Sequence, residues 1–160
     1  MALYEPSYVC KGDETAVIKT AKGVIKFKFF CEDAPKHAAA FIELAEKGFY
    51  DGISFHRVEP NFVIQGGDPL SREGGLAVGT GGPGYNLAAE FNSRPHLDGT
   101  VAMARAGHPD SAGSQFYICL GTQSFLNGNY TVFGQVTEGL DVVHKVGRGD
   151  VMESVTIERG

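Results

Sequence analysis

Residues 15–30 read TAVIKTAKGVIKFKFF, in which two runs of strand-forming residues, Thr15–Thr20 and Val24–Phe30, flank Ala21-Lys22-Gly23. In the second run the apolar side chains alternate with lysines: Ile25, Phe27 and Phe29 against Lys26 and Lys28. Neighbouring side chains of a strand point to opposite faces, so this alternation predicts one buried and one solvent-facing side. The stretch therefore predicts an antiparallel hairpin and a fold built on β-structure.

A helix is predicted directly after the hairpin. Asp33 can cap its N-terminus, and Pro35 is tolerated in the first turn, where its missing amide has no helical partner. The core-facing stripe that follows has helical spacing and consists of Ala38, Phe41, Ile42 and Ala45. Gly48 is expected to end this helix, because glycine readily adopts the left-handed conformation found there.

The rest of the chain contains short strand-like runs. They are Ile53–Val58, Phe62–Gln65, Thr100–Ala104, Phe116–Leu120, Thr131–Val136 and Val155–Arg159. A second helix is predicted over Leu140–Val146. This pattern favours a mainly β fold, a closed eight-stranded antiparallel β-barrel capped by two α-helices, since closure removes exposed sheet edges. A two-sheet sandwich is the structural alternative.

Length and composition predict a single globular domain over residues 1–160, with residues 1–14 as an N-terminal extension that carries no motif. The net charge of −5 repels phosphate backbones and anionic membranes. There is no basic leader, and no apolar run approaches the roughly 20 residues that span a bilayer. We therefore expect a cytoplasmic protein, a monomer, that binds neither nucleic acid nor membranes.

Three cysteines occur at wide spacings: Cys10, Cys31 and Cys119. No two of them form a C-x-x-C pair, so neither a zinc ribbon nor a thioredoxin-like motif is predicted. Three reduced thiols are the expectation for a cytosolic chain. A regulatory bridge between Cys10 and Cys31 is the alternative, because both residues flank the first strands.

No residue pattern predicts a metal or a cofactor. Gly79–Gly84 satisfies G-x-G-x-x-G, but the motif lies mid-chain without a βαβ unit, so we interpret it as a glycine-rich surface loop. The five histidines form no H-E-x-x-H pair and are expected to be surface or hydrogen-bonded residues; they are His37, His56, His96, His108 and His144. The nucleophile elbow G-x-S-x-G is also absent.

Three separated stretches combine polar and aromatic residues at strand spacing. The first is Phe55–Pro69, FHRVEPNFVIQGGDP, in which Ile53, Phe55 and Arg57 are predicted to share one face and Val63 and Gln65 another. The second is Met103–Ala106 followed by Gly113–Ile118, where Gln115 and Tyr117 share a face opposite Phe116 and Ile118. The third is Phe125–Gly128, which leads into Tyr130–Gly134.

In these stretches the chain resembles the cyclophilins. F-H-R-V-x-P-x-F-x-x-Q-G-G-D, M-A-x-A-G, G-S-Q-F-Y-I and V-F-G-x-V follow one another in the family's order, and the similarity runs from about Thr15 to the C-terminus. The resemblance implies an antiparallel barrel with a helix over each open end. It also implies a peptidyl-prolyl cis-trans isomerase that acts on proline-containing peptides and flexible or unfolded protein segments and assists protein folding as a chaperone.

The resemblance assigns a role to individual positions. Arg57 matches the catalytic arginine, and Gln65 the glutamine that holds the substrate backbone. The apolar pocket for the proline ring is matched by Phe62, Val63, Tyr117 and Leu126. The groove that pairs with the extended peptide is matched by Ala104, Arg105, Ala106 and Gln115, and the outer rim by Phe125 and Tyr130.

Five of these positions differ from the best-known eukaryotic pattern: Val63, Arg105, Tyr117, Phe125 and Tyr130. Phe125 stands where the eukaryotic rim has a tryptophan, and Phe125 and Tyr130 resemble bacterial members. Weak binding of cyclosporin is expected, because the rim tryptophan donates a hydrogen bond to that drug and phenylalanine has no donor. Arg105 beside the groove suggests a preference for acidic peptides.

Isomerisation requires no nucleophile, metal or proton relay. The X–Pro bond rotates slowly because amide resonance imposes a barrier of about 20 kcal/mol. A fixed Arg57 can donate a hydrogen bond to the proline nitrogen when the bond is twisted, and less well when it is planar. Two alternatives are a module that binds proline-containing segments without turnover and a barrel that holds a small apolar ligand. The inward-facing aromatic residues argue against the second, because they fill the interior: Phe27, Phe29, Phe41 and Phe116.

Overall fold

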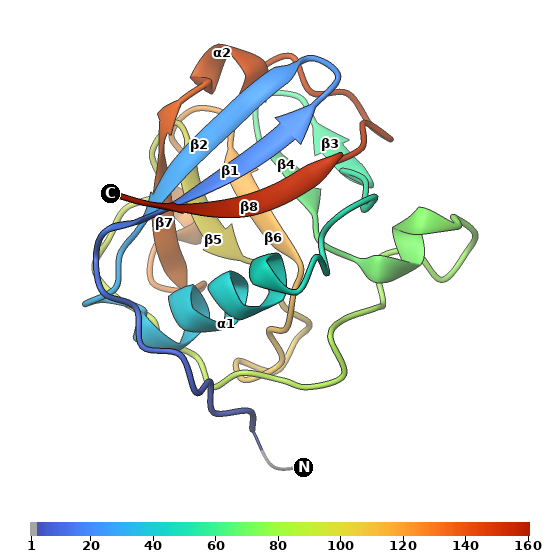
Figure 1. Cartoon of the computed structure of the whole chain (residues 1–160). Coiled ribbons are helices and arrows are strands. Elements are labelled where there is room, and N and C mark those ends of the chain that lie inside the picture. The colour runs from blue at the N-terminus through green and yellow to red at the C-terminus, as the bar shows by residue number, and fades with distance from the viewer. Residues whose placement is uncertain (1–2) are drawn as a thin grey trace.

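The computed structural model describes residues 3–160, which form one strongly curled antiparallel sheet of eight strands with two helices (Figure 1). The strands are β1 (Glu14–Thr20), β2 (Gly23–Phe29), β3 (Arg57–Glu59), β4 (Val63–Gly66), β5 (Thr100–Met103), β6 (Phe116–Cys119), β7 (Val132–Glu138) and β8 (Ser154–Arg159). Their order in the sheet is β3-β4-β6-β5-β7-β2-β1-β8. A single curled sheet excludes the two-sheet sandwich.

The predicted hairpin is confirmed as β1 and β2, which pair antiparallel with Ile18 opposite Ile25. The alternation is confirmed as well. Ile25, Phe27 and Phe29 are buried in the core, whereas the intervening lysines are partly or fully exposed. The turn needs Gly23, whose φ of 139° is a conformation that side chains rarely adopt. The interior is filled by side chains, with Phe27 and Phe41 packed edge to face at 5.3 Å between ring centroids.

The sheet is a half-barrel and does not close, which corrects the prediction of a closed barrel. Among the described residues its edge strands, β3 and β8, do not pair with each other. The predicted strand Ile53–Val58 is interrupted: the backbone of Phe55 bonds to Asp150 and Gly149 at 2.8 and 2.9 Å, outside the sheet. Because the ladder breaks there, Phe55 is buried and Arg57 exposed, so the prediction that they share one face was wrong.

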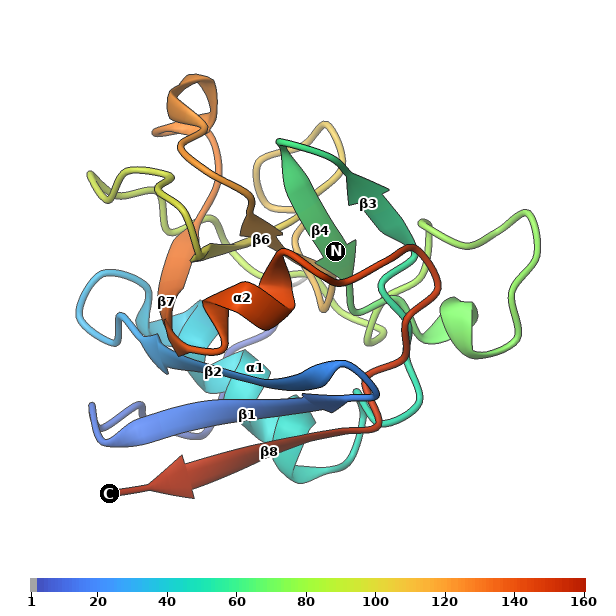
Figure 2. The same ribbon diagram turned by 90° about the horizontal axis from the view of Figure 1, so that it is seen from above.

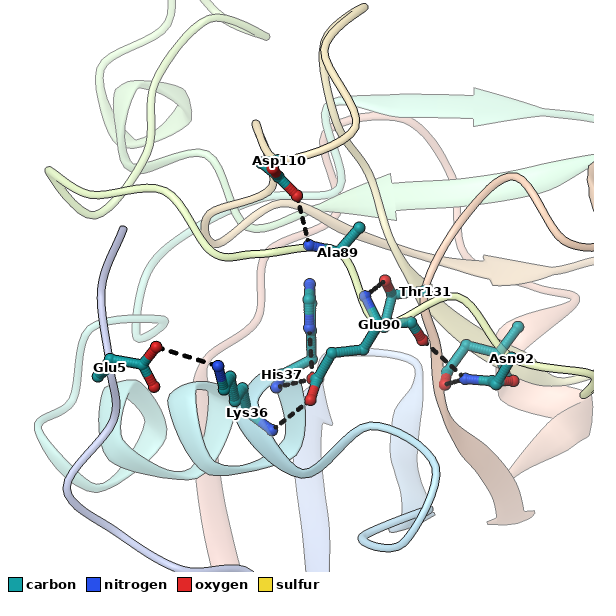
Figure 3. A network of polar contacts seen from close by, with 9 residues as sticks. Glu5, Lys36, His37, Ala89, Glu90, Asn92, Asp110 and Thr131 are labelled. Atoms are coloured by element: carbon teal, nitrogen blue, oxygen red, sulfur yellow. Dashed lines mark hydrogen bonds and ion pairs between the residues drawn. The ribbon is translucent and has the colours of Figure 1, made fainter. Parts of the chain in front are cut away.

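Helix α1 (Pro35–Glu46) covers one open end of the half-barrel (Figures 1 and 2). Its predicted cap is wrong: Asp33 makes no capping bond and instead pairs with Arg94 at 2.8 Å. Figure 3 shows what replaces it, the carboxylate of Glu90, which accepts from the backbone amides of Lys36 and His37 at 3.1 and 2.8 Å. A carboxylate that is distant in sequence thus provides acceptors for backbone amides in the first turn of α1, which have no partner within the helix.

The same carboxylate bonds to Nδ1 of His37 at 2.8 Å, and the His37 side chain is fully buried. Burial alone would raise the pKa of Glu90, but the hydrogen bonds from the His37 side chain and from the two backbone amides outweigh it and hold that pKa below its usual value. The amide of Glu90 in turn donates to the Thr131 hydroxyl at 2.9 Å (Figure 3). This network ties α1 to the segment that precedes β5.

The C-terminal end of α1 agrees with the prediction, because Gly48 follows it with a φ of 74°. Helix α2 spans only Leu140–Val143, shorter than the predicted Leu140–Val146, and lies at the opposite end of the half-barrel from α1 (Figure 1). Gly139 before it has a φ of 83°. Among the described residues, no helix has the length and apolar character needed to cross a membrane.

The N-terminal segment is fastened to the sheet by a disulfide between Cys10 and Cys31, with 5.5 Å between their Cα atoms. This corrects the expectation of three reduced thiols; Cys119 alone is free, and it is buried. Next to the bridge, Glu14 accepts from the amides of Lys11 and Gly12. Cys10, Cys31 and Glu14 also form the one group with metal-ligand spacing among the described residues, but the disulfide consumes both sulfurs.

Candidate active site

Two neighbouring cavities lie where β3, β4 and β6 meet the loops around them. The small cavity, of ≈ 140 Å³, is lined by Arg57, Phe62, Val63, Gln65, Ala104, Arg105, Tyr117, Leu126 and Tyr130. The large cavity, of ≈ 540 Å³, shares Gln65, Ala104 and Arg105 with the small one. Its other walls include Ala106, Gln115 and the glycine-rich loop 79–84. The structure thus brings together residues from three stretches that are far apart in sequence.

Arg57 and Gln65 face each other across the β3–β4 pair. The turn between these strands needs Asn61 in the left-handed region, with a φ of 62°, which asparagine tolerates better than most residues. Arg57 donates to Oε1 of Gln65 at 3.2 Å, and its guanidinium lies 5.6 Å from the centre of the Phe62 ring. The only carboxylate paired with it among the described residues is the exposed Glu59, at 3.7 Å.

A chain of amide hydrogen bonds runs from Arg57 to the glycine-rich loop. Gln65 donates through Nε2 to Gln115 at 3.2 Å, and Gln115 donates to the carbonyls of Gly79 and Gly81 at 3.0 and 2.9 Å. Each of the two glutamine side chains accepts through its oxygen and donates through its nitrogen, so all hydrogen bonds of this series run in the same direction. Gln65, the direct partner of Arg57, is therefore itself held by Gln115 and, through Gln115, by the glycine-rich loop.

The floor of the small cavity is apolar. It belongs to a second hydrophobic cluster on the face of the sheet away from the main core, made of Val63, Ala102, Tyr117, Cys119, Leu126 and Val132. Period-2 alternation places it there, since Phe116 and Ile118 of β6 point into the main core. Burial raises the pKa of the Cys119 thiol to about 12, so this thiol stays protonated and unreactive at neutral pH.

The rim of the small cavity is aromatic. Phe125 stacks on Phe62 with 5.6 Å between ring centroids, and it is 68% exposed and does not line either cavity. On the opposite side Tyr130 meets Tyr117 edge to face at 5.8 Å. Of the two predicted rim residues, Tyr130 therefore lines the small cavity, whereas Phe125 only packs against the lining residue Phe62.

Arg105 stands on the ridge between the two cavities. Its guanidinium lies 4.8 Å from the centre of the Tyr130 ring and 5.8 Å from that of Phe91. It donates to the carbonyls of Asn129, Ala106 and Gly107 at 2.9 to 3.2 Å. These bonds fix the side chain without neutralising its charge. Among the described residues, no aspartate or glutamate lines either cavity, whereas Arg105 lines both and Arg57 lines the small one.

One residue of the site region was missed by sequence analysis, which expected His96 only to be a surface or hydrogen-bonded histidine. His96 is fully buried behind Tyr117, and its Nε2 lies 2.8 Å from the Tyr117 hydroxyl. The signal available in the sequence was Tyr117 itself, because a buried tyrosine needs a hydrogen-bond partner for its hydroxyl. The sequence does not show which residue supplies that partner.

Comparisons with known proteins agree on one family. The family model for cyclophilin type peptidyl-prolyl cis-trans isomerases matches residues 15–159. A peptidyl-prolyl cis-trans isomerase of Synechococcus elongatus is 47% identical over 144 residues, which cover 89% of this chain and 94% of that protein. Peptidyl-prolyl cis-trans isomerase B of Bacillus subtilis is 47% identical over 136 residues, covering 84% and 90% of the two chains.

Solved structures show the same fold. A crystal structure of a cyclophilin type isomerase from Cryptosporidium parvum superposes with a TM-score of 0.82 at 28% identity, covering 96% of this chain and 99% of that one. A second structure of the Cryptosporidium protein, determined in the presence of the dipeptide Ala-Pro, has a TM-score of 0.80 at 28% identity and covers 91% and 99%.

Proposed function

The chain belongs to the cyclophilin-type peptidyl-prolyl cis-trans isomerase family, and we propose that it isomerises X–Pro bonds in the small cavity with Arg57 as the catalytic residue. The arrangement that carries this proposal is a guanidinium held beside an apolar pocket. Arg57 is bonded to Gln65 and faces Phe62, while Val63, Tyr117 and Leu126 form the walls around the same cavity.

The chemistry follows from the barrier to rotation. Twisting the X–Pro bond breaks amide conjugation and returns the lone pair to the proline nitrogen, at a cost of about 20 kcal/mol. Arg57 donates to that lone pair in the twisted state and finds no comparable acceptor in the planar state. The hydrogen bond therefore stabilises the transition state more than the substrate. A guanidinium suits this role because it is rigid and stays charged.

The remaining lining residues position the substrate. The apolar floor binds the proline ring, so that the ring stays fixed while the preceding carbonyl swings. Gln65 and the backbone of Ala104–Ala106 bind the flanking chain. This single site lies within what we propose to be one isomerase domain over residues 1–160.

Proline-containing peptides and flexible or unfolded protein segments are the proposed substrates, and assistance of protein folding is the proposed role. The Ala-Pro dipeptide used with the Cryptosporidium relative supports this substrate class. Cyclosporin is proposed to bind weakly, because the exposed Phe125 offers no hydrogen-bond donor.

The proposal is tested by NMR exchange spectroscopy on an Ala-Ala-Pro-Phe peptide with the wild type, Arg57→Ala and Arg57→Lys. Removing a preorganised donor costs about 10²–10³-fold in rate, so we expect Arg57→Ala to lose that much and Arg57→Lys to recover part of it. Circular dichroism establishes that the variants are folded. Turnover by Arg57→Ala equal to that of the wild type would refute the role of Arg57. Peptide binding without any wild-type turnover would identify a binding module instead.

A further inference from the structure

A buried imidazole connects Tyr117 of the small cavity with Asn127, the residue that follows the lining residue Leu126. His96 bonds through Nε2 to the Tyr117 hydroxyl at 2.8 Å, and its ring lies nearly parallel to that of Tyr117, with an angle of 12° between the planes. Its Nδ1 lies 3.0 Å from Oδ1 of Asn127, which follows the 3₁₀ turn Ser124–Leu126. Tyr117 and Leu126 both line the small cavity.

The hydrogen bonds determine which nitrogen of His96 carries the proton. The backbone amide of His96 donates to Oδ1 of Asn127 at 2.8 Å, so this atom is an acceptor. Nδ1 bonds to the same oxygen and must therefore carry a hydrogen. In the neutral ring Nε2 then has a lone pair, which accepts the hydrogen of the Tyr117 hydroxyl. The only hydrogen of that hydroxyl consequently points away from the cavity.

We propose that His96 is a positioning residue of the isomerase. By accepting a hydrogen bond from the Tyr117 hydroxyl, it keeps the floor of the small cavity apolar for the proline ring. This inference rests on the proposed role of the small cavity. Without the acceptor, the hydroxyl bonds to water in the empty cavity, and the proline ring displaces that water on binding. The hydroxyl is then left without a partner, which weakens binding.

The same geometry makes proline binding sensitive to acid. Protonation puts a hydrogen on Nε2, which then donates to the Tyr117 oxygen and forces the hydroxyl hydrogen toward the cavity. Burial lowers the pKa of His96, which preserves the neutral ring at neutral pH. The polar groups that face the ring are the Tyr117 hydroxyl and the Asn127 amide. The charged residues two positions away in sequence pair elsewhere, Arg94 with Asp33 and Asp98 with His144.

Two isosteric variants separate the two bonds of His96. The amide of His96→Gln reaches the position of Nε2, so it can accept from Tyr117 but cannot titrate. The amide of His96→Asn reaches the position of Nδ1, so this variant keeps the hydrogen bond to Asn127 and has no acceptor for the Tyr117 hydroxyl. Dissociation constants and exchange rates of the Ala-Ala-Pro-Phe peptide are measured between pH 4.5 and 8 by NMR.

For the wild type we expect the dissociation constant to rise about tenfold toward acid pH. The exchange rate of the bound peptide should not change, because the cavity floor contacts the proline ring equally when the X–Pro bond is planar and when it is twisted. His96→Gln should bind as the wild type does at neutral pH and lose the acid dependence. His96→Asn should bind about tenfold more weakly at every pH. The double variant His96→Asn/Tyr117→Phe should bind the peptide no more weakly than Tyr117→Phe alone, because neither protein has a Tyr117 hydroxyl that could lack a partner.

Wild-type binding by His96→Asn, or an acid dependence that survives in His96→Gln, would overturn the inference while leaving isomerisation intact. A wild type without turnover would instead refute the proposed function. The tautomer of His96 can be measured on the wild type alone, so this test does not depend on whether the variants fold. The nitrogen chemical shifts of His96 must show hydrogen on Nδ1 and none on Nε2 at neutral pH; the opposite tautomer would contradict the proposal.

Discussion

Arg57 and Gln65 lie opposite each other in the β3–β4 pair, and the guanidinium donates to the side-chain oxygen at 3.2 Å. Gln65 also donates to Gln115, so its amide cannot turn without breaking a bond at each end. An exposed arginine samples many rotamers, and ordering such a side chain costs up to about 2 kcal/mol. The pairing with Gln65 meets part of that cost before the substrate binds.

Replacing Gln65 is predicted to lower activity, both because Arg57 loses its partner and because the flanking chain of the substrate loses a contact. In Gln65→Ala the guanidinium loses its acceptor, Gln115 loses its donor and the substrate loses a contact, so we expect kcat/KM for a proline tetrapeptide to fall at least about tenfold. Glu59→Gln is the matched control, because it removes only the exposed partner of Arg57 at 3.7 Å. It should change kcat/KM less than about twofold. Equal effects of the two changes would contradict the positioning by Gln65.

Both cavities are lined by Arg105 and, among the described residues, by no aspartate or glutamate, which predicts a preference for acidic substrates. Peptides that differ only by Glu, Gln or Lys next to the X–Pro pair should be turned over in that order. The Glu/Gln ratio is expected to be about 1.5–5, the range for exposed ion pairs. Arg105→Gln should abolish this ratio, and added salt should reduce it in the wild type. A ratio that is unchanged in Arg105→Gln would exclude Arg105 as its source.

The disulfide is predicted to stabilise the fold and to leave the site unaffected. Cys10 and Cys31 are 21 residues apart, and closing a loop of this size contributes about 3 kcal/mol. For a chain of this length that corresponds to a fall in Tm of about 6–12 °C when the bridge is reduced or replaced in Cys10→Ser/Cys31→Ser. Neither cysteine lines a cavity, so kcat/KM at 25 °C should stay the same. A reductant that shifts the Tm of the double variant as well would point to another cause.

Acid is predicted to destabilise the protein through the carboxylate that caps α1. The pKa of Glu90 is lowered in the folded state, so the folded chain releases this proton more readily than the unfolded chain. The stability from this group is complete above the ordinary glutamate pKa of 4.5 and is lost as the pH falls through the lowered value.

Urea unfolding of the wild type and Glu90→Gln tests this acid dependence. The variant should be less stable at pH 7 by about 2 kcal/mol, because it loses charge-assisted bonds. It should also show a shallower decline in unfolding free energy between pH 5 and 3. Parallel pH curves for the two proteins would show that the acid sensitivity originates elsewhere. Glu5, an exposed partner of Lys36, offers a control in Glu5→Gln, for which we expect little change.

Elements with local signals were predictable from the sequence alone. The alternation in Val24–Phe30 identified the hairpin, because strand faces follow from the next residue but one. Helical spacing and Gly48 located α1 in the same way. The segments that carry Arg57, Gln65 and Tyr117 were recognised from their order along the chain.

Contacts between residues that are distant in sequence became visible only in the folded chain. The cap of α1 comes from Glu90, 53 residues from His37, and not from the adjacent Asp33. The predicted strand Ile53–Val58 is interrupted where the backbone of Phe55 bonds to Asp150, a position at which the sequence pattern shows only another apolar residue. The partner of Tyr117 is His96, 21 residues away. Such bonds are selected by which groups are buried together once the sheet curls, since a buried polar group without a partner is costly.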